Sequence, residues 1–443
     1  MADSGVGTEP ARPGVVVVAT GTTPMALALP VPVELGRVVS AEGVKHEIAD
    51  DRMSREHAVV RRDRGTWAIA DKESRNGTFV NTERIGVEVR RRGDCVVRCG
   101  HTVFVLLEDM RGHDAPRVDA GEQVIGPELA RAFVEIERAA GAGDTLLVHG
   151  ESGSGKESAA RLFHDKGPRR GGPFVAVNCA AIPEGVAERL LFGAKKVAFS
   201  GAIDAFGYFQ QAAGGTLFLD EIADLDPSVQ AKLLRAIETR EILPLGASAP
   251  AKLDLGIVAA SHRELRGAVA DRRFRDDLYD RLGRVTVRLP PLRERKVDIA
   301  RLVQREVARA GAEGSANADA AKLAVHPRLV ETCCARPWPG NVRELIAAVR
   351  EAITKARAAG RDTVRAEDLA ETAGQPMGSA ADETNLEKPG KASPGELDRA
   401  TVIAALAGAN GVVAAAARAL GLHRTQLYRL MEKLGIARDG AAE

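Results

Sequence analysis

The chain has few cysteines and lacks a segment suited to a membrane. Its five cysteines, among 443 residues, are too few and too scattered for a disulfide framework, and none belongs to a CxxC or Cys/His zinc spacing. Apolar runs of about 18 residues are absent, and the N-terminus has no charged region followed by a long apolar one. A soluble, cytoplasmic protein with reduced thiols is therefore expected.

The chain also lacks an excess of charge of either sign. Its net charge of +1 creates no global field that attracts nucleic acid, so any contact with DNA has to be local. A hydrophobic content of 45% is enough for real cores, and a chain of 443 residues suggests two to four domains.

A glycine-rich stretch at 150–157 reads GESGSGKE, between an apolar run at 145–148 and a helix-like stretch at 158–163. This strand–loop–helix order predicts a phosphate-binding loop, in which backbone N–H groups and Lys156 face the phosphates. The pattern GxxxxGK[ST] is complete except for Glu157 in the last place; the alternative is a glycine-rich surface turn. The expected ATP-binding residues of the loop are Gly150, Glu151, Ser152, Gly153, Ser154, Gly155, Lys156 and Glu157.

A second motif at 214–221 reads GGTLFLDE, an apolar strand that ends in two acids. Asp220 is expected to bind Mg²⁺ and Glu221 to polarise the attacking water, since two acids at the end of a buried strand are otherwise costly. Together, the two motifs predict nucleotide hydrolysis. Asn178, at the end of the apolar run 174–179, could orient Glu221, or it could simply cap a helix.

The first 110 residues contain short β-rich runs separated by turns, which is typical of an all-β sandwich. Its loops carry GR at 36–37, SREH at 54–57 and SRNGTFVN at 74–81, and their arginines, serine and asparagine could converge on a phosphate. The alternative is that Asn76–Gly77 forms only a hairpin turn and the arginines are solvated. The expected strands are Val15–Thr20, Val33–Val38, His57–Arg62, Thr66–Asp71 and Thr102–Leu107.

These blocks resemble, in order and spacing, the pattern GR, SRxH, SxNGTxxN of the forkhead-associated (FHA) domain. The resemblance implies that the domain binds phosphothreonine peptides. It implies that Gly36, His57 and Asn81 hold the loops in shape. The implied peptide contacts are Arg37, Ser54, Arg55, Arg75 and Asn76.

Strand-like and helical stretches alternate from about 125 to 372, which predicts a parallel α/β core. The segments GESGSGKE, GGTLFLDEI, FRDDLYDRL, LPPLRERKVDI and WPGNVREL resemble the AAA+ domain of sigma-54-dependent transcriptional activators, also called bacterial enhancer-binding proteins. Glu157 is usual in that family. The resemblance implies a ring, usually a hexamer, with ATP between subunits and a helical lid from about residue 295.

The same resemblance assigns further roles by position. Asn178 is the switch partner of Glu221, and His262 follows the sensor I strand, where the family more often has Asn. Arg343 is the sensor on the lid. Arg275 and Arg281, in an arginine-rich helix that could also be an ordinary solvated face, are the inter-subunit arginines.

The loop that contacts sigma-54 in this family usually reads GAFTGA, and here residues 197–202 read VAFSGA. Phe199, Ser200 and Gly201 are the implied contacts. Val197 replaces a glycine and loses freedom at positive φ, whereas Ser200 keeps the hydroxyl of threonine. Two outcomes stay open: productive coupling to sigma-54, or a phosphopeptide-responsive DNA-binding repressor or adaptor that does not engage it.

The C-terminal region has helix–turn–helix spacing, with five basic residues against one acidic residue between 413 and 438. The segment ARALGLHRTQLYRLMEKLGI resembles the Fis-type helix–turn–helix that ends many such activators. The expected DNA contacts are His423, Arg424, Thr425, Gln426 and Arg429.

These observations predict a multidomain chain, with an FHA β-sandwich, an α/β AAA+ core with a helical lid, and an all-α helix–turn–helix. The expected function is phosphothreonine-responsive, sigma-54-dependent regulation of transcription driven by ATP hydrolysis. The cofactors are ATP and Mg²⁺, and the partners are sigma-54 polymerase, promoter-upstream DNA, a phosphothreonine protein such as a Ser/Thr kinase, and further copies of the chain, from dimer to hexamer. The expected divisions are 14–109 (FHA), 110–124 (linker), 125–372 (AAA+), 373–395 (linker) and 396–438 (helix–turn–helix).

Overall fold

The structure is a computed structural model. It describes residues 11–376 apart from 22, 114–117, 121–122, 144, 184, 196–204 and 314–322, together with 399, 402, 403, 427 and 431. The chain divides into two compact units, Met1–Met377 and Gly378–Glu443. Within the described residues, no helix is both long and apolar enough to cross a membrane.

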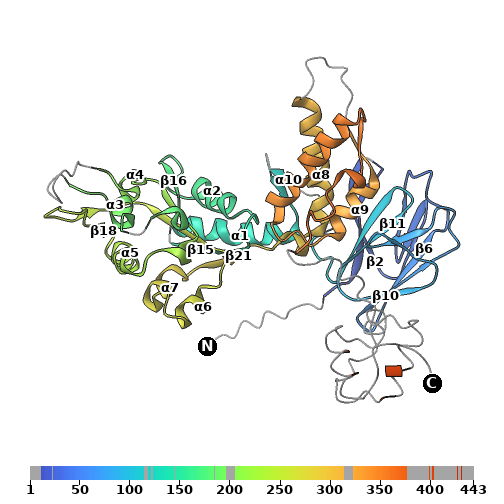
Figure 1. Ribbon diagram of the computed structural model, residues 1–443, viewed down its shortest axis with the longest axis horizontal. Coiled ribbons are helices and arrows are strands. Elements are labelled where there is room, and N and C mark those ends of the chain that lie inside the picture. Colours follow the sequence, from blue (N-terminus) through green and yellow to red (C-terminus); the bar gives the residue numbers. More distant parts are fainter. Residues whose placement is uncertain are drawn as a thin grey trace. The chain divides into compact units, whose positions relative to one another are not determined.

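The N-terminal part is a β-sandwich of two six-stranded sheets (Figure 1), so the expectation of an all-β fold is confirmed. Inward-facing residues such as Val17, Leu35, Trp67 and Phe104 form the core between the sheets. The first sheet has the order β2 (Thr23–Pro30), β1 (Gly14–Thr20), β12 (Thr102–Leu107), β11 (Cys95–Cys99), β8 (Thr78–Val80), β9 (Glu83–Arg84). The second sheet has the order β10 (Val89–Arg91), β7 (Thr66–Asp71), β6 (Ala58–Asp63), β3 (Val33–Leu35), β4 (Val38–Ala41), β5 (Val44–Glu47).

The prediction of one strand over Val33–Val38 is wrong, because the chain leaves the sheet at Gly36–Arg37 between β3 and β4. Gly36 lies against the loop that follows: a Cβ at this position would meet the carbonyl oxygen of Arg55 at 2.0 Å. The GR block is therefore a loop between two strands, and this loop brings Arg37 close to residues 53 and 54.

An α/β core follows, with a five-stranded sheet in the order β16-β17-β20-β15-β21. All its pairings are parallel, which confirms the α/β prediction. The faces of the sheet pack into two cores: Leu146, Val148 and Phe218 face α1 and α2, whereas Leu217 and Leu219 face α3 and α5. Its elements are α1 (Pro127–Ala142), β15 (Leu146–His149), α2 (Lys156–Lys166), β16 (Phe174–Asn178), η1 (Cys179–Ala181), α3 (Ala187–Phe192), α4 (Tyr208–Gln211), β17 (Thr216–Asp220), η2 (Ile222–Asp224), α5 (Pro227–Thr239), β18 (Glu241–Ile242), β19 (Ala251–Lys252), β20 (Gly256–Ser261), α6 (Leu265–Ala270), α7 (Asp276–Leu282) and β21 (Thr286–Arg288).

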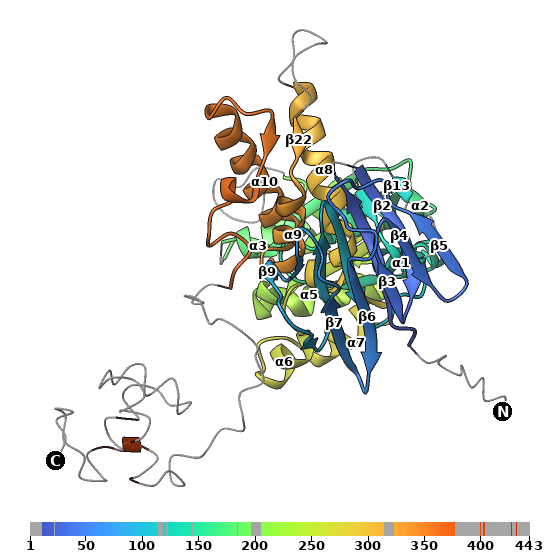
Figure 2. The ribbon, with the colours of Figure 1, turned by 90° about the vertical axis from the view of Figure 1, so that its right-hand side faces the viewer.

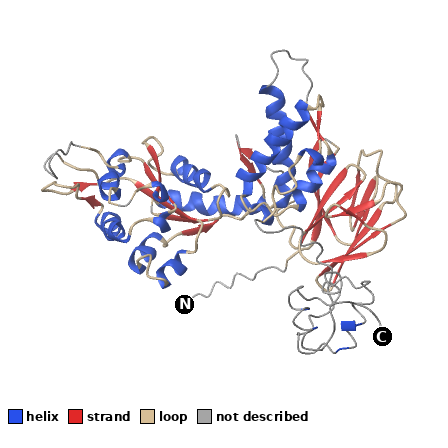
Figure 3. Cartoon of the chain, in the orientation of Figure 1, coloured by secondary structure: helices blue, strands red, loops and turns tan. Residues whose placement is uncertain are grey.

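The region after β21 is mainly helical and forms the lid (Figure 3). Its helices pack around buried residues that include Val303, Leu329, Trp338 and Val349. A short hairpin, β13 (Val118–Ala120) and β14 (Gln123–Ile125), lies in the segment that was expected to be a linker. The lid elements are η3 (Leu292–Glu294), α8 (Lys296–Glu313), β22 (Ala324–Val325), α9 (Pro327–Ala335), α10 (Asn341–Ala358), β23 (Thr363–Val364) and η4 (Ala366–Asp368).

Candidate nucleotide and phosphopeptide sites

The glycine-rich loop lies between β15 and α2, as the motif predicts. Gly155 has φ of +110°, a conformation that suits glycine, and α2 begins at the next residue. Lys156 is buried, and its Nζ donates to the carbonyl oxygen of Gly150 at 3.2 Å and to Oε1 of Glu221 at 3.1 Å. The loop thus presents a helix N-terminus and a lysine on the same side, an arrangement suited to phosphate.

The two acids lie at the carboxyl end of β17, beside the loop. Burial raises the pKa of Asp220, although the charge of Lys156 opposes the shift. A half-buried carboxylate whose ionised form is disfavoured in this way fits a site for a divalent cation, because the cation would restore the charged form and oxygen is the ligand that Mg²⁺ prefers. Asp220 therefore suits the metal role that the sequence suggests.

Glu221 is held from two sides. Besides the ion pair with Lys156, its Oε2 accepts hydrogen bonds from the ring Nδ1 of His262 at 2.5 Å and from the backbone N–H of His262 at 3.2 Å. Burial would raise the pKa of Glu221, but these bonds outweigh it, and the pKa lies below its ordinary value. Glu221 is thus kept ionised, which is the state that a general base requires.

Asn178 lies next to Asp220 in the register of β16 and β17. Its side-chain oxygen accepts a hydrogen bond from the backbone N–H of Ala180 at 3.0 Å and caps η1. Here the asparagine has the capping contact that was one of its two predicted roles, and it also lines the same cavity as Glu221.

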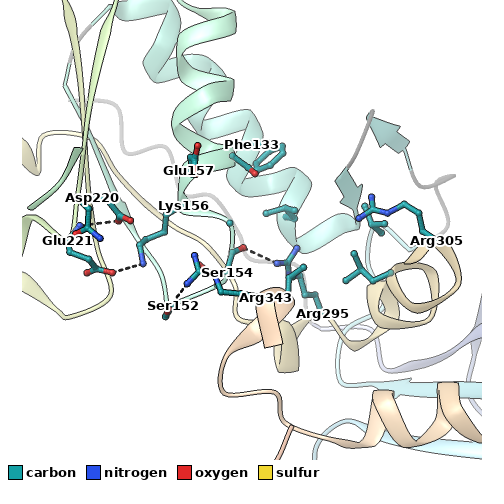
Figure 4. Close-up of a pocket in the computed structure, with 18 residues that line it drawn as sticks. Phe133, Ser152, Ser154, Lys156, Glu157, Asp220, Glu221, Arg295, Arg305 and Arg343 are labelled. Carbon is teal, nitrogen blue, oxygen red and sulfur yellow. Dashed lines mark hydrogen bonds and ion pairs between the residues drawn. The ribbon is translucent and has the colours of Figure 1, made fainter. Parts of the chain in front are cut away.

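A cavity of about 430 Å³ joins these groups to the lid (Figure 4). One end holds the glycine-rich loop, Asp220 and Glu221. The lid side is lined by the apolar side chains of Val124, Phe133 and Leu302 together with Arg295 and Arg305. A phosphate-binding loop and an apolar patch within a single cavity suit the phosphates and the base of a nucleotide.

Lid residues bind the loop directly. Arg343 donates to Oγ of Ser152 at 3.3 Å, as its predicted sensor role requires it to be near. Arg295 donates to the carbonyl oxygen of Ser154 at 3.0 Å, and the amide of Asn341 donates to the carbonyl oxygen of Ser152 at 3.0 Å. Sequence reasoning did not single out Arg295 or Asn341, although both stand in the LPPLRERKVDI and WPGNVREL segments.

The three loops that were predicted to bind a phosphopeptide meet at one end of the sandwich. Arg37 donates from Nε to the carbonyl oxygen of Met53 at 2.9 Å, and the amide of Asn76 donates to the carbonyl oxygen of Arg52 at 2.6 Å. Oγ of Ser54 accepts the backbone N–H of Arg75 at 3.2 Å, which links two of the predicted contacts directly. The structure therefore brings these loops together at one place, with Arg55 exposed beside them.

His57 connects two of these loops, the one at Ser54 and the one at Gly77, through its ring nitrogens. Its Nδ1 accepts the backbone N–H of Ser54 at 3.0 Å, so its Nε2 carries the proton that faces the carbonyl oxygen of Gly77 at 3.2 Å. Burial lowers the pKa of His57, which keeps the ring neutral and this pattern intact. Asn81 has a comparable position, because its Oδ1 accepts the backbone N–H of Val96 at 2.9 Å.

Four family models match the chain. These are the Sigma-54 interaction domain at 124–288, the FHA domain at 33–100, the AAA+ ATPase lid domain at 293–386 and the Bacterial regulatory protein, Fis family, at 393–434. The DNA-binding transcriptional regulator NtrC of Azospirillum brasilense is 40% identical over an alignment of 350 residues, and the match covers 73% of this chain and 72% of that protein.

The chain belongs to the sigma-54-dependent transcriptional activators.

Two further similar proteins are matched over a smaller share of their length. The acetoin catabolism regulatory protein of Cupriavidus necator is 41% identical over 70% of this chain, and the chain spans 47% of that relative. The crystal structure of NtrX from Brucella abortus in complex with ATP superposes with a TM-score of 0.52 at 28% identity, over 72% of this chain and 70% of that one.

Two predicted family residues lie away from the cavity of their own chain. Arg275 directly precedes α7 and pairs with Asp277 at 2.7 Å on the surface, and Arg281 lies within α7. Neither lines the nucleotide cavity, as is expected of arginines that would serve an adjacent subunit. The predicted sigma-54 contacts (Phe199, Ser200, Gly201) and DNA contacts (His423, Arg424, Thr425, Gln426, Arg429) lie outside the described residues.

Proposed function

We propose that this sigma-54 activator hydrolyses ATP under the control of a phosphothreonine partner and uses the reaction to remodel sigma-54 polymerase at promoters. The observation that carries the proposal is the single cavity in which Lys156, Asp220, Glu221 and the lid residue Arg343 meet. A membrane-independent activator of this kind acts where DNA and polymerase are, so the cytoplasm is its proposed location.

The chain's own residues have separable roles in the reaction. Backbone N–H groups of the loop and Lys156 bind the phosphates, and Asp220 would hold Mg²⁺, which supplies charge neutralisation when bound. Glu221 accepts a proton from water, whose oxygen attacks the γ-phosphorus. The bond to the β–γ bridging oxygen breaks, and ADP and phosphate leave.

The contacts of Glu221 suggest how the site becomes active. Phosphates bound in the loop would attract Lys156 and weaken its ion pair with Glu221. His262 would then remain as the group that orients the carboxylate, through the hydrogen bond from Nδ1. We therefore assign His262, in the place where the family more often has asparagine, the role of a positioning residue.

The neighbouring subunit completes the proposed site. Arg275, just before α7, is exposed and Arg281, on α7, is half-buried; neither lines its own chain's cavity, and both would approach the phosphate of an adjacent protomer. A ring assembly follows from this role, with the phosphopeptide loops facing a phosphothreonine protein and the Fis-type segment facing DNA upstream of the promoter.

The test is transcription in vitro with sigma-54 polymerase on a promoter that carries the chain's binding site. The full chain should form open complexes only with hydrolysable ATP, and Glu221→Gln should bind ATP but lower hydrolysis by roughly 10²- to 10⁴-fold. ATP hydrolysis without open complexes would instead support a DNA-binding repressor, the alternative that the VAFSGA sequence leaves open.

A further inference from the structure

The outer face of the first sheet is buried along β1 and β12. Along β1, Val15 and Val17 face the inner core of the sandwich, whereas Val16 and Val18 belong to the hydrophobic core of the lid. On β12, Val105 likewise joins the lid core, with 0% of its surface exposed. These two strands are therefore buried on both faces of the sheet.

The lid helices α8 and α9 provide the cover (Figure 2). Their buried residues Val303, Leu329 and Val330 share one continuous apolar cluster with Val16 and Val105 of the sandwich. Because this cluster is formed by two domains together, neither domain buries its apolar surface fully without the other.

An ion pair lies at one side of this contact. Nε of Arg98, on β11, donates to Oε2 of Glu331, on α9, at 2.5 Å, and the two side chains are only 9% and 2% exposed. The other oxygen of Glu331 accepts the backbone N–H of Thr82 at 3.2 Å. Both carboxylate oxygens of Glu331 therefore accept hydrogen bonds from the β-sandwich, while its backbone belongs to the lid.

Arg98 also connects this ion pair, through further contacts, to the loops predicted to bind the phosphopeptide. Its NH1 donates to the carbonyl oxygen of Gly100 at 2.9 Å. Gly100 touches the backbone of the neighbouring loop, since a Cβ there would lie 2.7 Å from the carbonyl carbon of Arg52. The carbonyl oxygen of Arg52 in turn accepts the amide of Asn76, a predicted phosphopeptide contact.

A second set of contacts ties the same two segments together. The carboxylate of Asp50 accepts the backbone N–H of His101 and the hydroxyl of Thr102, both at 2.8 Å. The carbonyl oxygen of Met53, three residues on, accepts Nε of Arg37. The loop at 50–54 is thus bonded on one side to the predicted phosphopeptide residues and on the other to the turn beside Arg98.

The lid continues the route to the nucleotide cavity. The carbonyl oxygen of Cys333, on α9, accepts Nε1 of Trp338 at 2.6 Å, and the carbonyl oxygen of Trp338 accepts the backbone N–H of Asn341 at 2.8 Å. Helix α10 begins at Asn341 and carries Arg343, and the side chains of both residues are bonded to the glycine-rich loop. The approach is close: a Cβ at Gly153 would lie 2.3 Å from the carbonyl oxygen of Gly340. A shift of the lid therefore changes the surroundings of the phosphates.

We propose that the lid is the direct receiver of the phosphopeptide signal: the sandwich is docked on α8 and α9, and the buried pair Arg98–Glu331 couples the phosphopeptide loops to the nucleotide cavity. This inference rests on the proposed function of both sites. Coupling between linked sites is reciprocal, so phosphopeptide and nucleotide change each other's affinity by the same factor.

The experiment measures that factor in the full chain. The Kd for ADP is determined with and without a degenerate peptide mixture that contains fixed phosphothreonine, with the unphosphorylated mixture as the blank. In the natural chain the ratio of the two Kd values should lie on the order of 5- to 150-fold. In Glu331→Gln it should fall close to one, while the mixture still binds.

The matched control is Glu306→Gln. Glu306 is a buried acid on α8 that pairs with Arg350 of α10 at 2.5 Å, inside the lid. This variant makes the same chemical change without touching the sandwich, so its ratio should stay within about 2-fold of the natural one, inside the usual scatter of such measurements. A ratio that survives in Glu331→Gln, or that is lost equally in both variants, overturns the proposal.

Hydrogen exchange gives a second measurement that needs no ligand. Glu331→Gln should accelerate amide exchange at 50–54 and 99–102 as well as in α9, whereas Glu306→Gln should spare both sandwich segments. Unchanged exchange at 50–54 in Glu331→Gln overturns the coupling route even if the mixture binds. If the phosphothreonine mixture fails to bind but amide exchange changes as expected, the phosphopeptide function is refuted and the structural connection between the sandwich and the lid is still supported.

Discussion

The two sheets of the β-sandwich have opposite surroundings although they share one core. On β1 the pattern GVVVVAT is buried almost without interruption, and on β12 every residue of TVFVLL is buried. In the second sheet, β5 alternates between half-buried and exposed residues, and β6 ends in RRD on the surface. Alternation marks a sheet with one solvated face, and continuous apolar runs mark one buried on both. The difference identifies the docked sheet.

A charge placed on the outer face of each sheet should give the largest difference in the free energy of unfolding. Val105→Asp puts a carboxylate into the shared apolar cluster, and we expect a loss of roughly 4 kcal/mol or more in the free energy of unfolding. Val38→Asp, at a position on β4 that is 49% exposed, should change it by less than about 0.5 kcal/mol. Denaturant unfolding followed by circular dichroism measures both, and equal losses would show that the outer faces do not differ.

The second largest difference is expected between two ion pairs, one on each sheet, in the stability that is lost when the pair is broken. Arg98→Ala leaves Glu331 buried without its partner and should cost about 3 kcal/mol. Arg90→Ala removes a pair with Asp63 on the exposed strand β10 and should cost at most about 1 kcal/mol. Replacing both Arg98 and Glu331 by leucine should restore most of the stability, because an apolar pair suits the cluster. If the double variant is as unstable as Arg98→Ala, packing rather than an unpaired charge explains the loss.

The smallest effect concerns His57, which joins loops of both sheets. Burial lowers its pKa below the ordinary 6.5, so the folded chain keeps the ring neutral while the unfolded chain takes up a proton. The stabilisation that comes from the neutral ring is complete above pH 6.5. It is lost as the pH falls toward the lowered pKa of His57, and there the free energy of unfolding changes by at most about 1.4 kcal/mol per pH unit. His57→Gln should flatten this part of the pH profile, as measured by unfolding between pH 5 and 7. An unchanged slope would assign the pH dependence to other groups.

Local chemistry explains why much of the molecule could be predicted from the sequence. The glycine-rich loop, the acids at 220–221 and the FHA blocks need particular residue types at fixed spacing, so the α/β core and the sandwich were predicted correctly. The Fis-type segment was predicted on the same grounds, and a family model matches it.

Contacts between distant segments could not be predicted in this way. Arg98 and Glu331 are 233 positions apart, and Glu221 meets His262 across 41 positions. No local rule pairs them, because only the packed fold decides which strand end or helix face comes close. The run VVVV in β1 did indicate burial on both faces, because a strand with one solvated face alternates apolar and polar residues. The run alone could not show which segment of the chain covers the outer face.

The attachment of the sandwich to the lid, rather than to the α/β sheet, has a consequence for an assembled ring. In the proposed ring, each proposed phosphothreonine site would be fixed to the helices that cover its own chain's nucleotide. A phosphorylated protein bound to one protomer would thus address that protomer alone, and the output of the ring would rise or fall in steps with the number of occupied sensors.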